Sequence, residues 1–248
     1  TSMTKATEMG VNTLELDLQI SQDGKVVVSH DAYFHSRYAT RPDGSEVKSE
    51  DPKEYLYTMP YSTIAKYDVG KRPSTVWPGK EQSPAIKPLA TELIDSVENY
   101  VKANGLDPMR YNIEIKCRKG KDEGKNWPEY HEFVDKCMEL LLSKNLGDRL
   151  VVQCFDARAL NYMHEKYPQV KLSYLISKKD TDWDTYMGRL NFTPDWLSPE
   201  FVIVDQTMVD NCRKAGIRLV PWTVDNEADI RRILDLHVEA IITNYPEV

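Results

Sequence analysis

Hydrophobic and polar residues alternate along the first part of the chain in a way that predicts a β-hairpin. Leucine and isoleucine alternate with polar residues over positions 13–20, the period of two expected for a strand. An Asp-Gly pair follows, which favours a tight hairpin turn, and an apolar run at 25–29 returns. This second strand leads directly into His30 and Asp31.

From Pro88 onward the pattern changes to helices that alternate with short apolar strands. Leu93, Val97 and Val101 show the spacing of one helix face, and the apolar runs are typical of strands buried on both sides. Such alternation indicates a parallel sheet. Helices are expected at 2–9, 89–104, 128–145, 182–190 and 227–236, and two more are expected, one that begins after Asp156 and one that ends before Gly216. Strands are expected at 111–116, 150–154, 170–176, 201–204, 217–222 and 240–243.

Seven strands, with the first hairpin counted once, fit a (β/α)8 TIM barrel that lacks its first strand in this sequence. An open doubly wound sheet is the alternative, but the chain shows no glycine-rich dinucleotide-binding motif. A chain of 248 residues suits one barrel domain, which we expect over 1–248. The sequence opens at Thr1 without an initiator Met, inside an expected helix, so we expect its start to be missing, with any targeting segment.

Residues 32–86 interrupt this arrangement as an insertion after the second strand. They are rich in Tyr, Pro, Lys and Asp and show little periodicity. A loop of this length is usually functional, for example a lid or substrate wall, and a small folded subdomain is the alternative. Its aromatic residues stand among many charges, which favours a wall around a polar ligand: Tyr33, Phe34, Tyr38, Tyr55, Tyr57, Tyr61 and Trp77.

The overall charge excludes one class of function. A formal net charge of −7 argues against a nucleic-acid-binding protein, which needs a basic surface. It is compatible with a small anionic substrate, because a bound cation and a lysine can reverse the local field.

No apolar run approaches the roughly 20 residues of a membrane span. The four cysteines match neither a zinc site nor a redox pair, so we expect free structural thiols at Cys117, Cys137, Cys154 and Cys212.

Carboxylates lie on two neighbouring predicted strands. Glu15 and Asp17 are two residues apart, so both side chains point to one face, and Glu114 and Lys116 repeat this spacing. Three carboxylates and one cation facing one cavity are what an oxygen-ligated divalent metal needs. The alternative is an edge strand whose carboxylates face water.

Other polar residues lie at predicted strand ends, where barrel active sites are found. His30 closes the hairpin that carries Glu15 and Asp17, and histidine is the usual proton donor at neutral pH. Gln153 and Trp222 end two later strands. The remaining histidines, in a loop or on predicted helices, are expected to be surface or packing residues: His35, His131, His164 and His237.

These residues together resemble the glycerophosphodiester phosphodiesterase family, of the PLC-like phosphodiesterase superfamily. Six segments in the family's order carry the resemblance, and they span nearly the whole chain apart from the insertion. They are Gly-Val-Asn-Thr-Leu-Glu-Leu-Asp-Leu-Gln-Ile-Ser-Gln-Asp-Gly (10–24), Val-Val-Val-Ser-His-Asp (26–31), Ile-Glu-Ile-Lys (113–116), Val-Gln-Cys-Phe-Asp (152–156), Pro-Trp-Thr-Val-Asp (221–225) and Ile-Ile-Thr-Asn-Tyr-Pro (241–246).

The resemblance implies an eight-stranded barrel that binds one divalent cation, Ca²⁺ or Mg²⁺. The family's metal-binding carboxylates match Glu15, Asp17 and Glu114, and its second catalytic histidine matches His30. In the family, a lysine contacts the phosphate, an aromatic residue forms a wall of the pocket, and a residue at a strand end faces the pocket. These positions match Lys116, Trp222 and Gln153, respectively.

Two departures from the family pattern stand out. The family opens with a His-Arg-Gly strand that is absent, so by family spacing the first catalytic histidine lies before Thr1. We therefore expect a truncated sequence of an active enzyme rather than a protein with seven strands, because a barrel that lacks a strand exposes two edges. The second departure is Asn244, where the family more often has Asp, and it has no expected consequence for the metal.

The resemblance implies metal-dependent hydrolysis of a small-molecule glycerophosphodiester to glycerol 3-phosphate and an alcohol by general acid/base catalysis. Alternatives are a phospholipase D-like enzyme acting on lipids, a phosphate-ester-binding pseudoenzyme without the first histidine, and another barrel enzyme acting on a phosphorylated sugar. The family alone suggests a periplasmic or secreted protein, and the sequence leaves the oligomeric state open.

Overall fold

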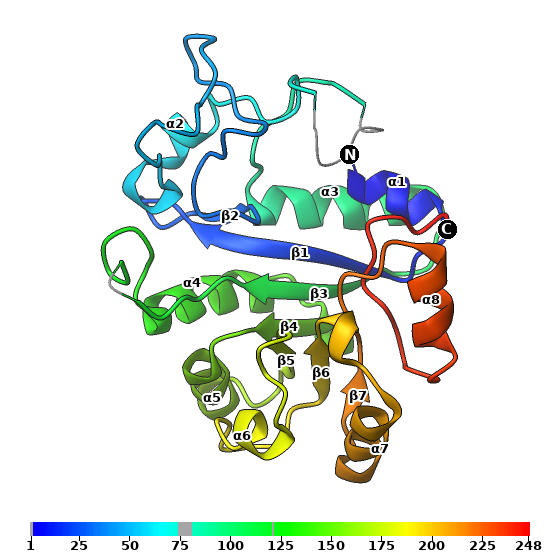
Figure 1. Ribbon diagram of the computed structural model, residues 1–248. Coiled ribbons are helices and arrows are strands. Elements are labelled where there is room, and N and C mark those ends of the chain that lie inside the picture. The colour runs from blue at the N-terminus through cyan, green and yellow to red at the C-terminus, as the bar shows by residue number, and fades with distance from the viewer. Residues whose placement is uncertain (1, 74–80, 121) are drawn as a thin grey trace. The chain divides into compact units, whose positions relative to one another are not determined.

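A computed structural model describes residues 2–73, 81–120 and 122–248 (Figure 1). The chain divides into two compact units. The first unit comprises Thr1–Glu15, Val97–Ile115 and Asn145–Val248. The second unit comprises Leu16–Ser96 and Lys116–Lys144, and so contains the whole predicted insertion. The aromatic residue Trp77 of that insertion lies outside the described residues.

Seven strands form one sheet in the order β2-β1-β3-β4-β5-β6-β7. β1 and β2 are antiparallel, and the pairs from β3 to β7 are parallel, which confirms the α/β class with a mostly parallel sheet. Closure of this sheet into a barrel stays a prediction. The strands are β1 (Thr13–Ile20), β2 (Val26–Val28), β3 (Arg110–Ile115), β4 (Leu150–Cys154), β5 (Lys171–Ile176), β6 (Trp196–Pro199) and β7 (Arg218–Leu219).

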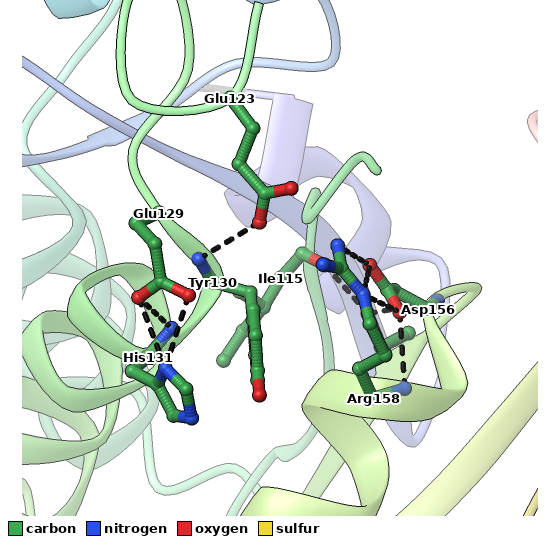
Figure 2. A network of polar contacts seen from close by, with 8 residues as sticks. Ile115, Glu123, Glu129, Tyr130, His131, Asp156 and Arg158 are labelled. Carbon is green, nitrogen blue, oxygen red and sulfur yellow. Dashed lines mark hydrogen bonds and ion pairs between the residues drawn. The ribbon is translucent and has the colours of Figure 1, made fainter. Parts of the chain in front are cut away.

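Helices α4 to α8 begin at polar side chains that satisfy free backbone N–H groups. Asp156 and Asp205 accept hydrogen bonds from backbone N–H groups of the helices that follow them. Figure 2 shows two of these helix starts, Glu129 with His131 and Asp156 with Arg158. The helices are α1 (Ser2–Glu8), α2 (Tyr61–Ile64), α3 (Ala90–Ala103), α4 (Tyr130–Ser143), α5 (Ala157–Lys166), α6 (Trp183–Met187), α7 (Gln206–Ala215) and α8 (Glu227–Leu234).

Two predicted strands of the first unit are wrong. The apolar run at 201–204 forms a 3-10 turn, Phe201–Ile203, on which Val202 is exposed, and the strand precedes it as Trp196–Pro199. The fully buried Ser198 belongs to that strand, so apolar character did not mark it. The segment 240–243 is not a strand either. Ile242 makes two backbone hydrogen bonds of 2.9 Å, to Pro221 and Val224, without continuing a ladder.

Residues of the predicted insertion pack together with Val27 of β2 in one apolar core of the second unit. Phe34 and Leu56 are both 1 % exposed, and the Phe34 ring stacks on Tyr67 with centroids 3.8 Å apart. Arg41 connects this segment by donating to the carboxylates of Asp51 and Glu54. The remaining residues of this core are Val27, Ala39, Val47 and Ile64.

The ammonium group of Lys87 is buried in the second unit. Lys87 is 6 % exposed, and its ammonium group donates to the Ser29 hydroxyl oxygen at 2.6 Å. The rings of Phe34 and Tyr38 lie 5.5 and 5.4 Å from its Nζ atom. Burial lowers the pKa of Lys87 from 10.5 to about 8, although the carboxylate of Asp31 partly offsets this effect.

We expect Lys87→Met to be more stable than the wild type at pH 7, by at most about 3 kcal/mol, because it removes a buried charge. The unfolded chain binds a proton at Lys87 up to pH 10.5, whereas the folded protein releases it near pH 8. Wild-type stability therefore rises with pH between these values relative to the variant. Urea denaturation at several pH values measures the difference.

The advantage of Lys87→Met should shrink as the pH rises from 7 to 10. Lys66→Met is the control, since Lys66 is an exposed lysine of the same unit. A stability difference that does not depend on pH would contradict the buried charge.

Candidate active site

The predicted metal ligands lie on two strands whose apolar residues fix their orientation. On β1, Leu14, Leu16 and Leu18 are at most 3 % exposed, so the alternate residues Glu15 and Asp17 share the opposite face. On β3, Glu114 is itself buried, at 6 % exposure. Burial of carboxylates is costly unless they are paired or bind a cation, so these positions need compensation.

The three carboxylates form one group. Glu15, Asp17 and Glu114 each offer an oxygen atom within 4.8 Å of the others. The structure thus brings together the three residues that the sequence predicts as ligands. Carboxylate oxygens are the ligands that hard cations such as Ca²⁺ and Mg²⁺ prefer, so this donor set fits such an ion. Asp17 also has a compensating cation in the second unit, because Lys116 Nζ lies 3.3 Å from its Oδ1 atom.

A chain of amide groups supports Glu15 within the first unit. Gln153 Nε2 donates to Glu15 Oε1 at 2.9 Å, and Asn112 Nδ2 donates to Gln153 Oε1 at 3.0 Å. Gln153 is 1 % exposed and Asn112 is 7 % exposed. Among the described residues, Asn112 Oδ1 is buried without a hydrogen-bond partner. The geometry gives Gln153 a supporting contact to Glu15, and its predicted role in substrate binding stays a prediction.

His30 lies at the surface of the second unit and is held on one side. Its side chain is 74 % exposed, and its Nδ1 atom lies 3.2 Å from Asp31 Oδ1. This hydrogen bond raises the pKa of His30 above its ordinary value, with a further contribution from the charge of Asp17 and an opposing one from Lys116. The imidazole therefore stays protonated to higher pH than a free histidine, with Nε2 directed away from Asp31.

Asp31 is fixed by several neighbours. Its Oδ2 atom accepts from the Tyr38 hydroxyl at 2.8 Å, and its carbonyl oxygen accepts from the Ser29 hydroxyl at 2.6 Å. Burial alone would raise the pKa of Asp31, but the hydrogen bonds from His30 and Tyr38 outweigh it and hold that pKa well below its usual range. Asp31 is therefore a stable anion that orients His30.

Trp222 is half-buried in the first unit, three residues beyond the end of β7. Its indole Nε1 donates to the Ser198 carbonyl at 2.8 Å, which fixes the ring plane. Phe155 packs edge-on against it at 5.6 Å between centroids and remains 40 % exposed. The side-chain hydroxyls of Ser173 and Ser198 form a buried pair at 2.7 Å.

Sequence reasoning missed several residues that support the site. Asn112 was detectable, since it lies two residues before Glu114 and therefore on the same face of β3. Lys87 and Tyr38 carried no such signal, because their contacts to Ser29 and Asp31 come from the tertiary fold of the insertion.

The other histidines make local contacts. His35 stacks between Tyr33 and Tyr38, and His131 contacts the Glu129 carboxylate at the start of α4 (Figure 2). The His164 ring stacks on Phe192 at 4.1 Å, and the structure places His237 after α8 with a positive φ of 55°. All four cysteines are buried and free. In the described part of the chain, no helix has the length and apolar character to cross a membrane.

Comparison with known proteins connects this geometry to one family. The chain is 24 % identical over 244 residues to a glycerophosphodiester phosphodiesterase of Caldanaerobacter subterraneus, covering 98 % of this chain and 86 % of the relative. It is 25 % identical over 254 residues to human lysophospholipase D GDPD1, covering 97 % of this chain and 76 % of the relative.

Solved structures share the fold. An Oleispira antarctica phosphodiesterase in complex with the product sn-glycerol-3-phosphate superimposes with a TM-score of 0.72 at 20 % identity, covering 98 % of this chain and 85 % of that chain. A glycerophosphodiester phosphodiesterase of Thermotoga maritima gives a TM-score of 0.65 at 24 % identity, with 99 % and 87 % covered. The profile of the Glycerophosphoryl diester phosphodiesterase family matches residues 1–248. The chain therefore belongs to the glycerophosphoryl diester phosphodiesterase family, whose members are phosphodiester hydrolases.

Proposed function

We propose that the protein hydrolyses glycerophosphodiesters to glycerol 3-phosphate and an alcohol, with a divalent cation held by Glu15, Asp17 and Glu114. The observation that carries the proposal is the cluster of these three carboxylates, each of which offers an oxygen atom within 4.8 Å of the others. Relatives named glycerophosphodiester phosphodiesterase and a structural relative that holds sn-glycerol-3-phosphate support the choice of substrate.

The cation, when bound, would neutralise charge on the phosphate oxygens. Lys116 would add a second positive contact to the phosphate, since it lies beside Asp17 and is only partly buried. Trp222, oriented by the Ser198 carbonyl, would form an aromatic wall of the substrate site.

His30 would act as the general acid. Asp31 occupies its Nδ1 side, so the Nε2 proton is the one available for transfer. In the reaction, the oxygen of water adds to phosphorus and releases one proton to solvent, the bond between phosphorus and the headgroup oxygen breaks, and the Nε2 proton of His30 passes to that oxygen. A raised pKa suits this role, because the acid must be protonated at neutral pH.

A second candidate is hydrolysis of lysophospholipids at the same bond. It is favoured by the human relative named lysophospholipase D GDPD1 and by the exposed aromatic side chain of Phe155 beside Trp222. The two candidates share the carboxylates and differ in whether the glycerol carries an acyl chain.

The full-length protein is expected to release glycerol 3-phosphate from glycerophosphocholine with Mg²⁺ or Ca²⁺, and EDTA is expected to abolish release. His30→Ala should lower kcat by about a hundredfold or more, because it removes the proton donor. His164→Ala is the matched control, since His164 lies on α5 and stacks on Phe192. Release of lysophosphatidic acid and choline from lysophosphatidylcholine, without hydrolysis of glycerophosphocholine, would support the second candidate, and hydrolysis of neither substrate by folded, metal-bound protein would refute both.

Asp31→Asn tests the acid role through pH. The amide cannot stabilise the imidazolium, so the pKa of His30 should fall toward its ordinary value. The alkaline limb of the profile of kcat/KM against pH should therefore move to lower pH, and NMR titration of His30 should show the same shift. Asp107→Asn is the control, an exposed carboxylate of the first unit. An unchanged alkaline limb with a shifted NMR titration would mean that another group is the acid.

Asn112→Asp tests the amide chain. The substitution is nearly isosteric but replaces the donor with an acceptor, so Gln153 should turn and lose its donation to Glu15. Calorimetric affinity for Mg²⁺ should fall about tenfold, and Glu15→Gln should weaken it at least as much.

Ser173→Ala serves as the control for Asn112→Asp, because Ser173 is buried in the same sheet, on β5, and bonds to Ser198 instead. Unchanged affinity of Glu15→Gln for both Mg²⁺ and Ca²⁺ would show that the cluster of Glu15, Asp17 and Glu114 does not hold the cation.

A further inference from the structure

A short two-stranded ribbon begins immediately after His30 and Asp31. The backbone N–H of Leu56 donates to Ala32 at 2.8 Å and that of Phe34 donates to Glu54 at 3.1 Å. Tyr33 and Tyr55 form the bridge between the two arms. Because side chains alternate along extended backbone, the ribbon has an inner face and an outer face.

The two faces differ sharply in burial. The inner residues Ala32, Phe34 and Leu56 are 6 %, 1 % and 1 % exposed and belong to the packed interior of the second unit. The outer residues Tyr33 and Tyr55 are only half-buried and meet edge-on at 5.7 Å between ring centroids. The packing of the inner face thus holds two tyrosines at the surface.

Further rings and cations extend this outer face. His35 stacks on Tyr33 at 5.8 Å, and Trp127 packs edge-on against Tyr55 at 5.1 Å. Lys53 Nζ lies 4.3 Å from the centre of the Tyr33 ring, and the Arg118 guanidinium lies 5.2 Å from that of Trp127. We call the group of Tyr33, His35, Lys53, Tyr55, Arg118 and Trp127 the outer ribbon face.

The charged groups and hydroxyls of this face are available to bind a ligand. Among the described residues, Lys53 and Arg118 make no ion pair with a carboxylate, and the hydroxyls of Tyr33 and Tyr55 make no hydrogen bond. The neighbouring carboxylate Glu54 is already bound by Arg41 and Tyr67. In the described part of the chain, this face therefore carries two exposed cations without a carboxylate partner and two phenol hydroxyls without a hydrogen bond, although the net charge of the chain is −7.

The arrangement discriminates between kinds of ligand. A quaternary ammonium group binds to the open face of an aromatic ring, but Lys53 already lies over the Tyr33 ring and His35 stacks on the same ring. Arg118 likewise lies over Trp127, which is only 7 % exposed. Hydroxyl and anionic groups, in contrast, are bound by phenol hydroxyls, ammonium and guanidinium groups.

The outer ribbon face is also close to the proposed acid. Tyr33 follows His30 by three residues, so their Cα atoms are at most about 11 Å apart. Tyr38 connects the two directly, because its ring stacks on His35 while its hydroxyl donates to Asp31. A general acid must contact the leaving oxygen, so the headgroup that departs with that oxygen lies within reach of this face.

We propose that the outer ribbon face binds the headgroup of the diester and favours a polyol headgroup with additional negative charge, such as a phosphorylated polyol, over a quaternary ammonium headgroup. The inference rests on the proposed hydrolysis only in taking His30 as the acid. Four of the six residues of this face belong to the insertion, for which the sequence predicts a wall around a polar ligand.

The experiment compares kcat/KM of the metal-loaded, full-length protein for three substrates: glycerophosphoinositol 4-phosphate, glycerophosphoinositol and glycerophosphocholine. We expect the wild type to prefer the first over the last by about tenfold or more, with the uncharged polyol between them. The double variant Lys53→Glu with Arg118→Glu should reduce this ratio at least about tenfold, because it replaces two cations with repelling charges.

Two further variants separate charge from structure. Lys66→Glu changes an exposed lysine of the same unit outside the outer ribbon face and should leave the ratio unchanged. Tyr33→Phe with Tyr55→Phe keeps the rings and should lower kcat/KM for both inositol substrates severalfold, with little effect on glycerophosphocholine.

Hydrolysis of all three substrates with the same ratio in the wild type and in the Lys53→Glu, Arg118→Glu variant would overturn the headgroup inference and leave the hydrolysis intact. If none of the three is hydrolysed, the proposed function fails, and calorimetry with glycerophosphoinositol 4-phosphate tests the face separately. Binding that the double charge variant abolishes would then support the inference, and absence of binding to the wild type would overturn it.

Discussion

Mutual repulsion of three carboxylates is the constraint on which the rest of this site depends. Unit charges a few ångströms apart repel strongly in a partly buried setting, so the cluster requires compensation from its surroundings. The structure supplies it separately to two members, through the amide of Gln153 at Glu15 and the ammonium group of Lys116 at Asp17. The alternation of β1 directs two of the carboxylates to the same face, and a divalent cation held by the three carboxylates would neutralise their charge further.

The supporting groups are polar side chains inside the protein, and each depends on a further one. Gln153 keeps its orientation because Asn112 donates to its carbonyl oxygen. His30 keeps its orientation because Asp31 is held by Tyr38, and the Asp31 carbonyl by Ser29. Burial of a lysine and several amides among apolar residues lowers the stability of the protein. The same polar groups fix the geometry of the reactive groups at the surface.

The sequence predicted the parts of the structure that follow from local pattern. Period-two alternation located β1 and placed Glu15 and Asp17 on one face, and the helix–strand rhythm indicated the parallel sheet. It failed where apolar character and strand formation diverge, as at Val202, which is exposed in a turn, and at Ser198, which is buried in a strand. The predicted roles of Lys116, Gln153 and Trp222 in binding substrate stay predictions. The contacts of Lys87 and Tyr38 could not be predicted, because they join residues that only the fold of the insertion brings together.

In the ribbon that follows His30, residues constrained by packing in the interior alternate with residues that face solvent. Its inner positions, Phe34 and Leu56, are held by packing, whereas its outer positions, Tyr33 and Tyr55, meet solvent. Substitutions at the outer positions can therefore change which molecules the surface accepts while the interior that supports the surface stays the same. Ligand preference in such an enzyme can diverge by single replacements at every second residue, without a new fold and with little loss of stability.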